Sequence, residues 1–262
     1  VPTVVPAAIE ALRAPTVLEG LGTTVIRNAT GNLQFPRVSA KAAGTGATEV
    51  EADTASGMEM DDVSLTPQRV AANTKYSKQL ILQGGAEVDA LIANELAAAM
   101  NAYVDDYAFD AIMASTDVDV YNTADAALSA TVANAMEAAV LGAGGNLGGA
   151  SYVMSPQAYL LSKSLAQVAD VNALWENGQF NMYNAVATPY LVNDTLDATG
   201  TGGRMIFGNF AQGGLLAYFG GIDILIDQYS NASTAQIALH VNRFFDFGIR
   251  QGGALSRAVK LS

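Results

Sequence analysis

Two stretches near the C-terminal end decide the fold: FGNFAQGGLLAYFGGIDILIDQYS at 207–230 and IALHVNRFFDFGIRQGGALSRAV at 237–259. Apolar and polar residues alternate at 222–227 and 237–243, and this alternation is typical of strands with one buried face. It predicts strands at 215–219, 222–227, 236–247 and 254–261, with Gly220-Gly221 as the turn between the first two. A sheet is therefore expected to dominate the end of the chain.

The segment from 87 to 113 is predicted to form a long helix. Apolar side chains recur in it at helical spacing, and Gly84-Gly85 mark the expected start. At about 1.5 Å per residue, this segment would span roughly 40 Å. Shorter helices are expected at 127–141 and 155–168, and short strands at 32–38, 151–154, 188–192 and 204–207. Together these elements predict an α+β fold.

The N-terminal region carries no comparable pattern. The first 27 residues contain prolines at 2, 6 and 15, and we interpret them as an extended arm. Residues 42–68 contain six acids and no base, which disfavours their burial in the chain's own core. We therefore expect a mobile loop there, or a loop that lies on another subunit.

The composition excludes several kinds of chemistry. The chain has 262 residues, no cysteine and one histidine, His240. It therefore has no disulfide framework, thiol nucleophile or cysteine zinc site, and one copy cannot supply a two-histidine metal site. A net charge of −12 argues against electrostatic binding of nucleic acid. Because only 15% of the residues are charged, we expect neighbouring subunits to cover part of the surface.

Motifs for catalysis or metal binding are incomplete. The glycine cluster at 142–149 has Leu147 where a dinucleotide loop requires glycine. The loop with Asp117 and Asp119 lacks the glycine and the glutamate of a calcium loop. His240 lies in an alternating strand, which favours a structural role. We predict no catalytic residue, metal ligand or cofactor; an acidic enzyme or binding module that uses His240 and the 117–119 loop is the remote alternative.

The order and spacing of these elements resemble those of the major capsid proteins of tailed bacteriophages, the family with the Hong Kong 97-type fold. The clearest stretch is 206–259, in which Arg243 and the pair Phe245-Asp246 stand where the family usually has an arginine and an aromatic–acid pair. SLTPQRVAANTKYSKQLI at 64–81 resembles the segment that leads from the family's extended loop into its long helix. YVMSP at 152–156 resembles the strand-to-helix step of the axial domain.

The resemblance implies a division of the chain. Residues 1–27 would be the N-terminal arm, 28–72 the extended loop, 73–123 and 228–262 the peripheral domain with its spine helix, and 124–227 the axial domain. An end at Val1 would fit family members whose N-terminal scaffolding region is cut off, although removal of a tag would give the same end. No transmembrane or targeting segment is recognised in the sequence.

Some family members are covalently cross-linked between a loop lysine and an asparagine of a neighbour. Here residues 42–68 contain no lysine, Lys41 is the nearest one, and Thr234 and Val241 occupy the corresponding closing-strand positions. Covalent cross-linking is therefore not expected, and non-covalent contacts or a decoration protein would hold the shell together.

The function that the resemblance implies is assembly of hexamers and pentamers of this chain into an icosahedral shell around double-stranded DNA. The shell would belong to a virion assembled in the bacterial cytoplasm, with decoration, portal and scaffolding proteins as further partners, and without a membrane or sequence-specific DNA binding. An encapsulin-like or gene-transfer-agent shell is the first alternative. The expected contacts between subunits join basic residues of the arm and closing region to acidic residues of the loop: Arg13, Arg27, Arg243, Arg250 and Arg257, and Glu49, Glu51, Asp53, Asp61 and Asp62.

Overall fold

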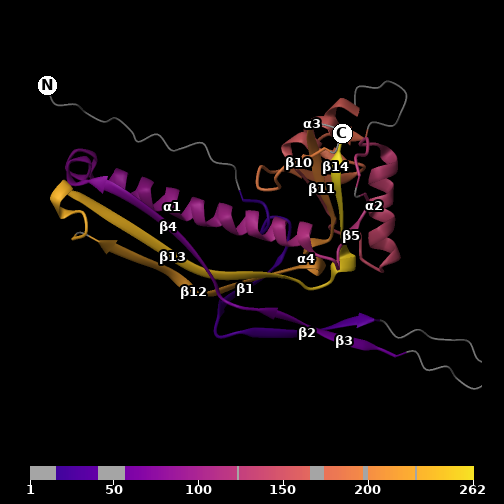
Figure 1. The fold of residues 1–262 in the computed structure, drawn as a ribbon, viewed down its shortest axis with the longest axis horizontal. Helices are drawn as coiled ribbons and strands as arrows, with labels where there is room; N and C mark the ends of the chain where they lie inside the picture. The colour runs from indigo at the N-terminus through magenta and orange to yellow at the C-terminus, as the bar shows by residue number, and fades with distance from the viewer. Residues whose placement is uncertain (1–15, 41–56, 123, 166–173, 197–199, 228) are drawn as a thin grey trace, which may run out of the picture.

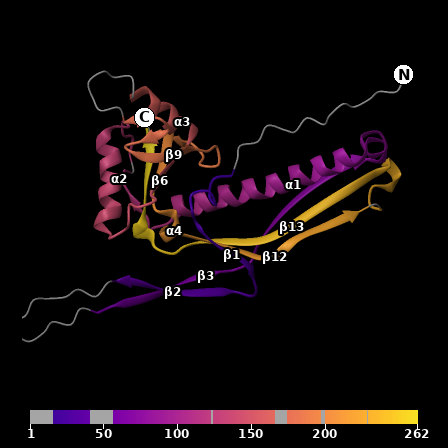
Figure 2. The ribbon, with the colours of Figure 1, turned by 180° about the vertical axis from the view of Figure 1, so that it is seen from behind.

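A computed structural model describes residues 16–40, 57–122, 124–165, 174–196, 200–227 and 229–262. An elongated part, made of a sheet and one long helix, extends from a compact part that contains the C-terminus (Figure 1). A two-stranded hairpin leaves the elongated part on the side opposite the helix (Figures 1 and 2). The fold is α+β, as the sequence predicts.

Four strands form the elongated sheet, in the order β1 (Thr24–Ala29), β12 (Gly214–Asp227), β13 (Gln236–Ile249) and β4 (Gln68–Ser77). β13 runs antiparallel to both β12 and β4, whereas β1 is parallel to β12. The strands predicted at 215–219 and 222–227 form the single strand β12, because the chain passes through Gly220-Gly221 with a shift of register instead of a turn. The strand predicted at 236–247 is confirmed as β13.

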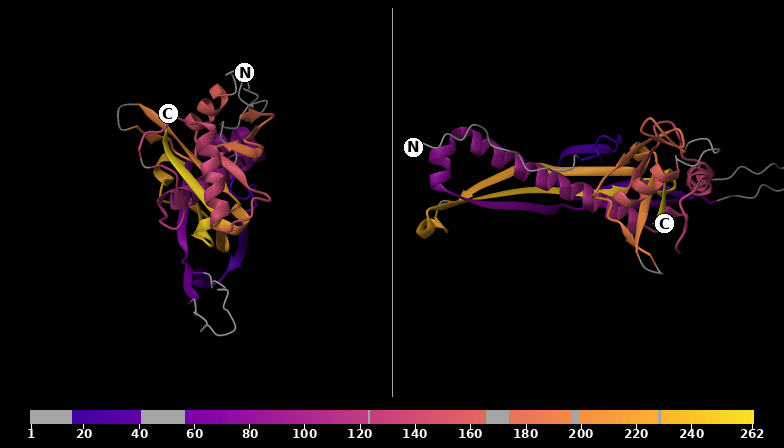
Figure 3. Two further views of the ribbon diagram at one scale, coloured as in Figure 1. Left: turned by 90° about the vertical axis from the view of Figure 1, so that its right-hand side faces the viewer. Right: turned by 90° about the horizontal axis from the view of Figure 1, so that it is seen from above.

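Helix α1 (Lys78–Ala114) lies along one face of this sheet (Figures 1 and 3). The predicted start at Gly84-Gly85 is wrong, because the helix continues through both glycines to a cap at Ser77. The Ser77 hydroxyl accepts a hydrogen bond from the backbone N–H of Leu80 at 3.2 Å, which satisfies one of the free donors of the first turn. Toward the sheet, α1 buries a row of apolar side chains: Leu96, Met100, Val104, Phe109 and Ile112.

The compact part is a second sheet with helices α2 (Ala130–Gly142) and α3 (Pro156–Leu165) packed on it. Its strands are, in spatial order, β5 (Asp119–Val120), β14 (Leu255–Leu261), β11 (Thr201–Gly208), β6 (Ser151–Met154), β9 (Tyr183–Ala187), β8 (Gln179–Phe180) and β7 (Trp175–Glu176), with β10 (Asp194–Thr195) paired to β11. The strands predicted at 151–154, 204–207 and 254–261 are confirmed. The strand predicted at 188–192 is wrong, because β9 has already ended at Ala187.

The hairpin consists of β2 (Leu33–Ala40) and the antiparallel β3 (Glu59–Leu65). In the ribbon view the hairpin runs below the compact part, on the side of the elongated sheet opposite α1 (Figure 1). The short helix α4 (Phe210–Gly213) and the 3-10 turns η1 (Ala232–Thr234) and η2 (Gly252–Ala254) complete the described elements.

The strands are grouped differently from the predicted domain boundaries. β4 begins inside the predicted loop 28–72, and β12 falls in the predicted axial domain 124–227, yet both pair with β13 in the elongated sheet. β14 was expected in the peripheral domain but pairs with β11 in the compact part. Alternation along one strand does not reveal which strand lies beside it. The division into arm, loop, peripheral and axial domains stays a proposal, with these three strands reassigned.

Candidate assembly interface

The middle of the hairpin is held to the rest of the chain by Arg37. Its Nη2 lies 2.8 Å from Asp61 Oδ2 on β3 and 2.6 Å from Asp117 Oδ2, which follows α1. Its Nη1 donates a hydrogen bond to the carbonyl oxygen of Ile249 at 3.4 Å. The two carboxylates raise the pKa of Arg37, and the guanidinium in turn lowers the pKa of Asp61. Arg37 therefore joins the hairpin to the ends of α1 and β13.

Asp246 is a second anchor at the hairpin root, on β13. Its buried carboxylate accepts hydrogen bonds from the backbone N–H of Thr66 at 2.7 Å and of Phe247 at 2.8 Å. The Tyr107 hydroxyl of α1 lies 3.4 Å from the same carboxylate. Burial, together with the negative charge of Asp246, raises the pKa of Tyr107. This carboxylate therefore fixes the junction between β3 and β4 against both β13 and α1.

Apolar packing under the hairpin is confined to its root. Leu65, with Leu33 and Phe35, lies against the face of β12 that carries Leu215 and Phe219. Where β3 crosses β13, a Cβ at Gly248 would lie 2.8 Å from the Leu65 side chain and 2.9 Å from that of Val63. Gly248 is thus required by the close approach of the two strands.

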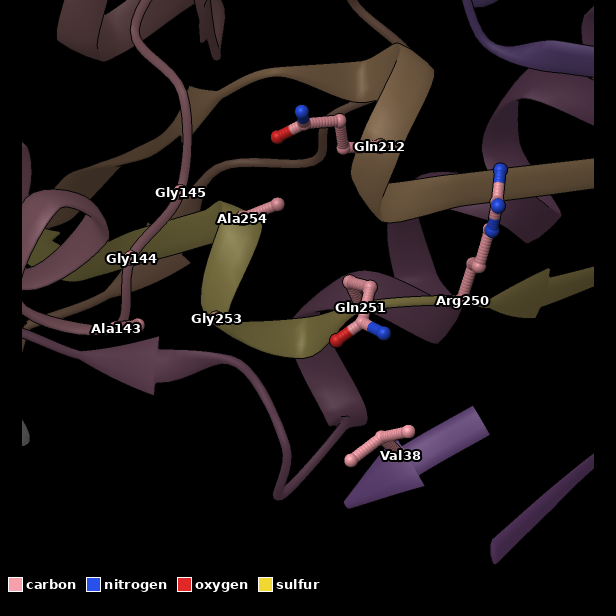
Figure 4. Close-up of a pocket in the computed structure, with 9 residues that line it drawn as sticks. All are labelled: Val38, Ala143, Gly144, Gly145, Gln212, Arg250, Gln251, Gly253 and Ala254. Carbon is pink, nitrogen blue, oxygen red and sulfur yellow. The ribbon is translucent and has the colours of Figure 1, made fainter. Parts of the chain in front are cut away.

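Two cavities separate the hairpin from the body of the chain. One has a volume of about 520 Å³ and extends to Gln212 and the 143–145 segment (Figure 4). The other has a volume of about 470 Å³ and is bounded by Phe35, Val63 and Leu215. Val38, Arg250 and Gln251 line both cavities. The exposed Arg250 side chain makes no hydrogen bond or ion pair with any described residue, so that its charge is available at the opening.

The N-terminal segment before β1 is fixed to α1 by Asp105. This carboxylate is only 3% exposed and accepts a hydrogen bond from the backbone N–H of Val17 at 2.6 Å. Burial raises the pKa of Asp105 to about 6, although the backbone hydrogen bonds from Val17 and Leu18 act in the opposite direction. Nearby, Glu19 accepts a hydrogen bond from the Tyr218 hydroxyl at 2.9 Å and lies 3.0 Å from Arg27.

Two of the arginines predicted to contact neighbours have partners within the subunit. The Arg243 guanidinium lies 3.5 Å from the centre of the Tyr218 ring and donates a hydrogen bond to Asn101 Oδ1 at 3.0 Å. Arg257 is half-buried and donates to the carbonyl oxygen of Ile112 at 3.3 Å, and burial lowers its pKa. Sequence alone could not show this, because both partners are distant along the chain.

The other predicted contact residues differ in their availability. Arg27 pairs with Glu19, and Asp61 pairs with Arg37, although both side chains remain largely exposed. Asp62 is exposed and, like Arg250, has no side-chain partner among the described residues. Arg13, Glu49, Glu51 and Asp53 lie outside the described residues.

The residues considered for chemistry do not form a site. Asp117 is held by Arg37, so that it is not free to begin a calcium loop with Asp119. His240 lies on β13 between Leu225 of β12 and Asn73 of β4. In the part of the chain that the structure describes, no cluster of histidine and carboxylate side chains is suited to hold a metal ion. Within the same ranges, no helix is long and apolar enough to span a membrane.

Sequence reasoning missed the contacts at the base of the hairpin and of the N-terminal segment. Asp117 is interpreted from the sequence only as part of a loop, and the sequence patterns single out neither Asp105 nor Arg37. A signal was present for Asp105, because it follows the apolar Val104 in a helix that otherwise buries only apolar residues on this side. The partners of all three residues are set by tertiary structure.

A long helix on a long sheet, a compact second part and a projecting hairpin define a class of protein: shell-forming subunits with the Hong Kong 97-type fold. Among solved structures, the capsid of an empty GTA particle covers the whole chain with a TM-score of 0.75 at 16% identity, and 95% of that chain is covered. The structure titled Mycobacterium phage Adephagia covers 95% of this chain and is itself covered over 91%, with a TM-score of 0.67 at 12% identity. Microbacterium phage Oxtober96 gives a TM-score of 0.70 at 10% identity over 97% of this chain and 94% of the other.

The chain belongs to the phage capsid family, whose sequence model matches residues 1–259. A curated relative, the major capsid protein of Halomonas phage phiHAP-1, is 25% identical over 261 residues, which is 96% of this chain. The chain spans only 42% of the length of that relative. The family resemblance seen in the sequence is confirmed, and the family is one of structural proteins.

Proposed function

We propose that this chain is a major capsid protein whose copies assemble, as hexamers and pentamers, into an icosahedral shell around double-stranded DNA. The observation that carries the proposal is the hairpin β2–β3. It lies outside both sheets, its apolar packing is near its root, and cavities of about 520 and 470 Å³ lie between it and the body. A segment with so few contacts in its own subunit gains its packing from a neighbour.

The charges at the hairpin support contacts between subunits. Arg250, at the opening of both cavities, and Asp62, on β3, have no side-chain partner among the described residues. The acidic residues Glu49, Glu51 and Asp53 precede β3 in the sequence. We therefore assign Arg250 as the principal basic contact for the acidic loop of an adjacent copy, with Arg13 and Arg27 of the arm as further candidates. Each exposed pair would contribute only about 0–1 kcal/mol, but repetition over a shell favours correct partners.

The net charge of −12 suits a wall that must enclose DNA without adsorbing it. In this proposal the shell belongs to a virion and forms in the cytoplasm of a bacterial host. Decoration, portal and scaffolding proteins are the further partners of such a shell. Residues 42–68 lack lysine, which favours a shell held by non-covalent contacts.

The test is to purify the protein and examine it by negative-stain electron microscopy and light scattering. Closed particles tens of nanometres across are expected, as for a shell of many copies. A monodisperse monomer under all ionic strengths and concentrations tested would contradict the proposal. The variant Arg250→Glu tests the proposed contact, because it should reduce the particle yield while the subunit stays folded.

A gene-transfer-agent shell is the second candidate, and the similarity to the GTA particle capsid favours it. An encapsulin-like compartment shares the same fold. The contents of purified particles separate these possibilities: long genomic DNA of uniform length indicates a phage head, short fragments of host DNA a gene-transfer agent, and protein cargo a compartment.

A further inference from the structure

The far half of β12 is an apolar strand with an unpaired edge. β1 pairs with β12 only as far as Phe219, and no described strand pairs with the outer edge beyond that point. Side chains on both faces of this half are exposed, including Ile224 at 56% and Leu225 at 60%. Soluble proteins protect such edges with charge, proline or a covering segment, because an unpaired apolar strand associates with other strands. This edge is therefore expected to be covered.

The opposite edge of the same sheet has complementary features. β4 is the other outer strand, and β12 and β4 lie on opposite sides of β13 (Figures 1 and 2). Between β4 and α1 lies a cavity of about 370 Å³, lined by Ala71, Ala72, Ala99, Met100 and Tyr103, among others. Its volume is large enough to receive a branched apolar side chain. One edge of the sheet thus presents apolar side chains, and the other presents a partly apolar cavity.

The charges of the two edges are also complementary. Asp223 and Asp227 of β12 lie in the same rows of the sheet as Asn242 and Ala238 of β13, on the face away from α1. Arg69 and Lys75 of β4 point to that same face, because they pair with Phe244 and Ala238. Lys75 is exposed and makes no ion pair with any described residue. An acidic edge and a basic edge therefore carry their charges on the same side of one sheet.

We infer that the β12 edge of one copy pairs with the β4 edge of a second copy, so that the elongated sheet continues from subunit to subunit. This inference rests on the proposed function, since it names one contact of the assembly. Because β13 is antiparallel to both strands, β12 and β4 run in the same direction, and copies placed side by side join them as a parallel pair. The contact is heterologous, which allows closed rings.

The register of the joined strands follows from the rows of the existing sheet. Asp227, Ala238 and Lys75 share one row, as do Ile224, Val241 and Ala72. Continuing the rows without a shift places Asp227 opposite Lys75 of the second copy, with Asp223 diagonal to Arg69. The same register places Ile224 opposite Ala72, beside the cavity under α1.

The absence of cysteine from the chain makes disulfide trapping a clean test. The double variant Ile224→Cys, Ala72→Cys is assembled, oxidised with copper phenanthroline and run on a non-reducing gel. Within one subunit the two positions are separated by β13, two strand spacings of about 4.8 Å, which is too far for a disulfide. A ladder of linked dimers, trimers and larger species is expected. The matched control is Ile224→Cys with Ala71→Cys, because Ala71 points to the other face and should give no ladder.

A charge variant tests the register. Lys75→Glu, added to the double-cysteine chain, places two acids opposite each other and should slow the cross-linking roughly threefold. Lys75→Gln should have a smaller effect. A rate unchanged by Lys75→Glu would overturn the proposed register.

The outcomes separate this inference from the proposed function. Shells without a ladder would overturn the sheet contact and leave the capsid function standing. A ladder without closed particles would support the sheet contact and overturn the shell. Neither particles nor a ladder would overturn both, whereas a ladder in both cysteine variants would show random collision and overturn the sheet contact.

Discussion

The buried carboxylate of Asp105 accepts a hydrogen bond from the backbone N–H of Val17 at 2.6 Å, although the two residues are 88 positions apart. The contact fixes the segment before β1 to the middle of α1. Burial raises the pKa of Asp105 to about 6. Protonation of this carboxylate therefore makes the free energy of unfolding depend on pH.

The first prediction concerns this pH dependence. The pKa of Asp105 is higher in the folded chain than its usual value of 3.8, so that the folded chain binds the proton more tightly between these two values. The free energy of unfolding should therefore fall as pH rises from about 4 to about 6, and this contribution should be level above that. Asp105→Asn removes the contribution of this carboxyl group. The excess of the unfolding free energy at pH 4.5 over that at pH 7.5 should therefore fall by roughly 2 kcal/mol.

Urea unfolding of the dissociated subunit, followed by circular dichroism at both pH values, measures this effect. Asp110→Asn is the control, because Asp110 lies on the exposed side of the same helix. If Asp105→Asn and Asp110→Asn changed the pH dependence equally, the assigned role of Asp105 would be wrong.

The second prediction concerns the attachment of the hairpin. Asp117→Asn removes one of the two carboxylates that face Arg37 and weakens the link between the hairpin and the end of α1. We expect faster cleavage by proteases within 33–40 and 59–65 and a loss of about 1 kcal/mol of stability. Limited proteolysis followed by mass spectrometry measures the first effect. Asp119→Asn is a suitable control, and equal cleavage of the two variants would contradict the prediction.

The third prediction concerns the crossing of β3 over β13. Gly248→Ala adds a Cβ that would lie under 3.0 Å from the side chains of Leu65 and Val63, so that the hairpin root must shift. Such overpacking should cost about 1–3 kcal/mol of unfolding free energy. Gly221→Ala, on the neighbouring strand, meets no atom within 4 Å and serves as the control. Thermal unfolding that is identical for the two variants would show that the crossing is not tightly packed.

The sequence predicts individual elements better than it predicts their partners. Alternation is sufficient for β13, and helical spacing locates most of α1, because these patterns reflect burial of one face along a continuous segment. The start of α1 was missed, since the cap at Ser77 outweighs the helix-breaking tendency of Gly84-Gly85. The pairing of β14 with β11 and of β12 with β1 was missed because these partners are distant in sequence.

The sequence likewise locates charged residues but does not show their partners. A basic residue in an alternating strand gives no sign of whether its partner is in the same subunit. Arg243 contacts Asn101 and the Tyr218 ring, whereas Arg250 has no side-chain partner among the described residues. Charge balance along the sequence therefore marks a basic region but does not show which of its arginines have partners within the subunit.

The last prediction tests that ranking with two charge reversals in the same region. Arg250→Glu changes an exposed side chain that has no partner in the described ranges, so that the unfolding free energy of the subunit should change by less than about 0.5 kcal/mol. It replaces the cation at the opening of both cavities with an anion, and the yield of particles should therefore fall at least several-fold.

Arg257→Glu instead places a carboxylate beside the carbonyl oxygen of Ile112 in a half-buried position, and it should lower the unfolding free energy by about 2–4 kcal/mol. Denaturant unfolding of dissociated subunits and light scattering of assembly reactions measure the two effects separately. Normal particle yield from Arg250→Glu would remove Arg250 from the interface, and an undiminished stability of Arg257→Glu would return Arg257 to the list of surface contacts.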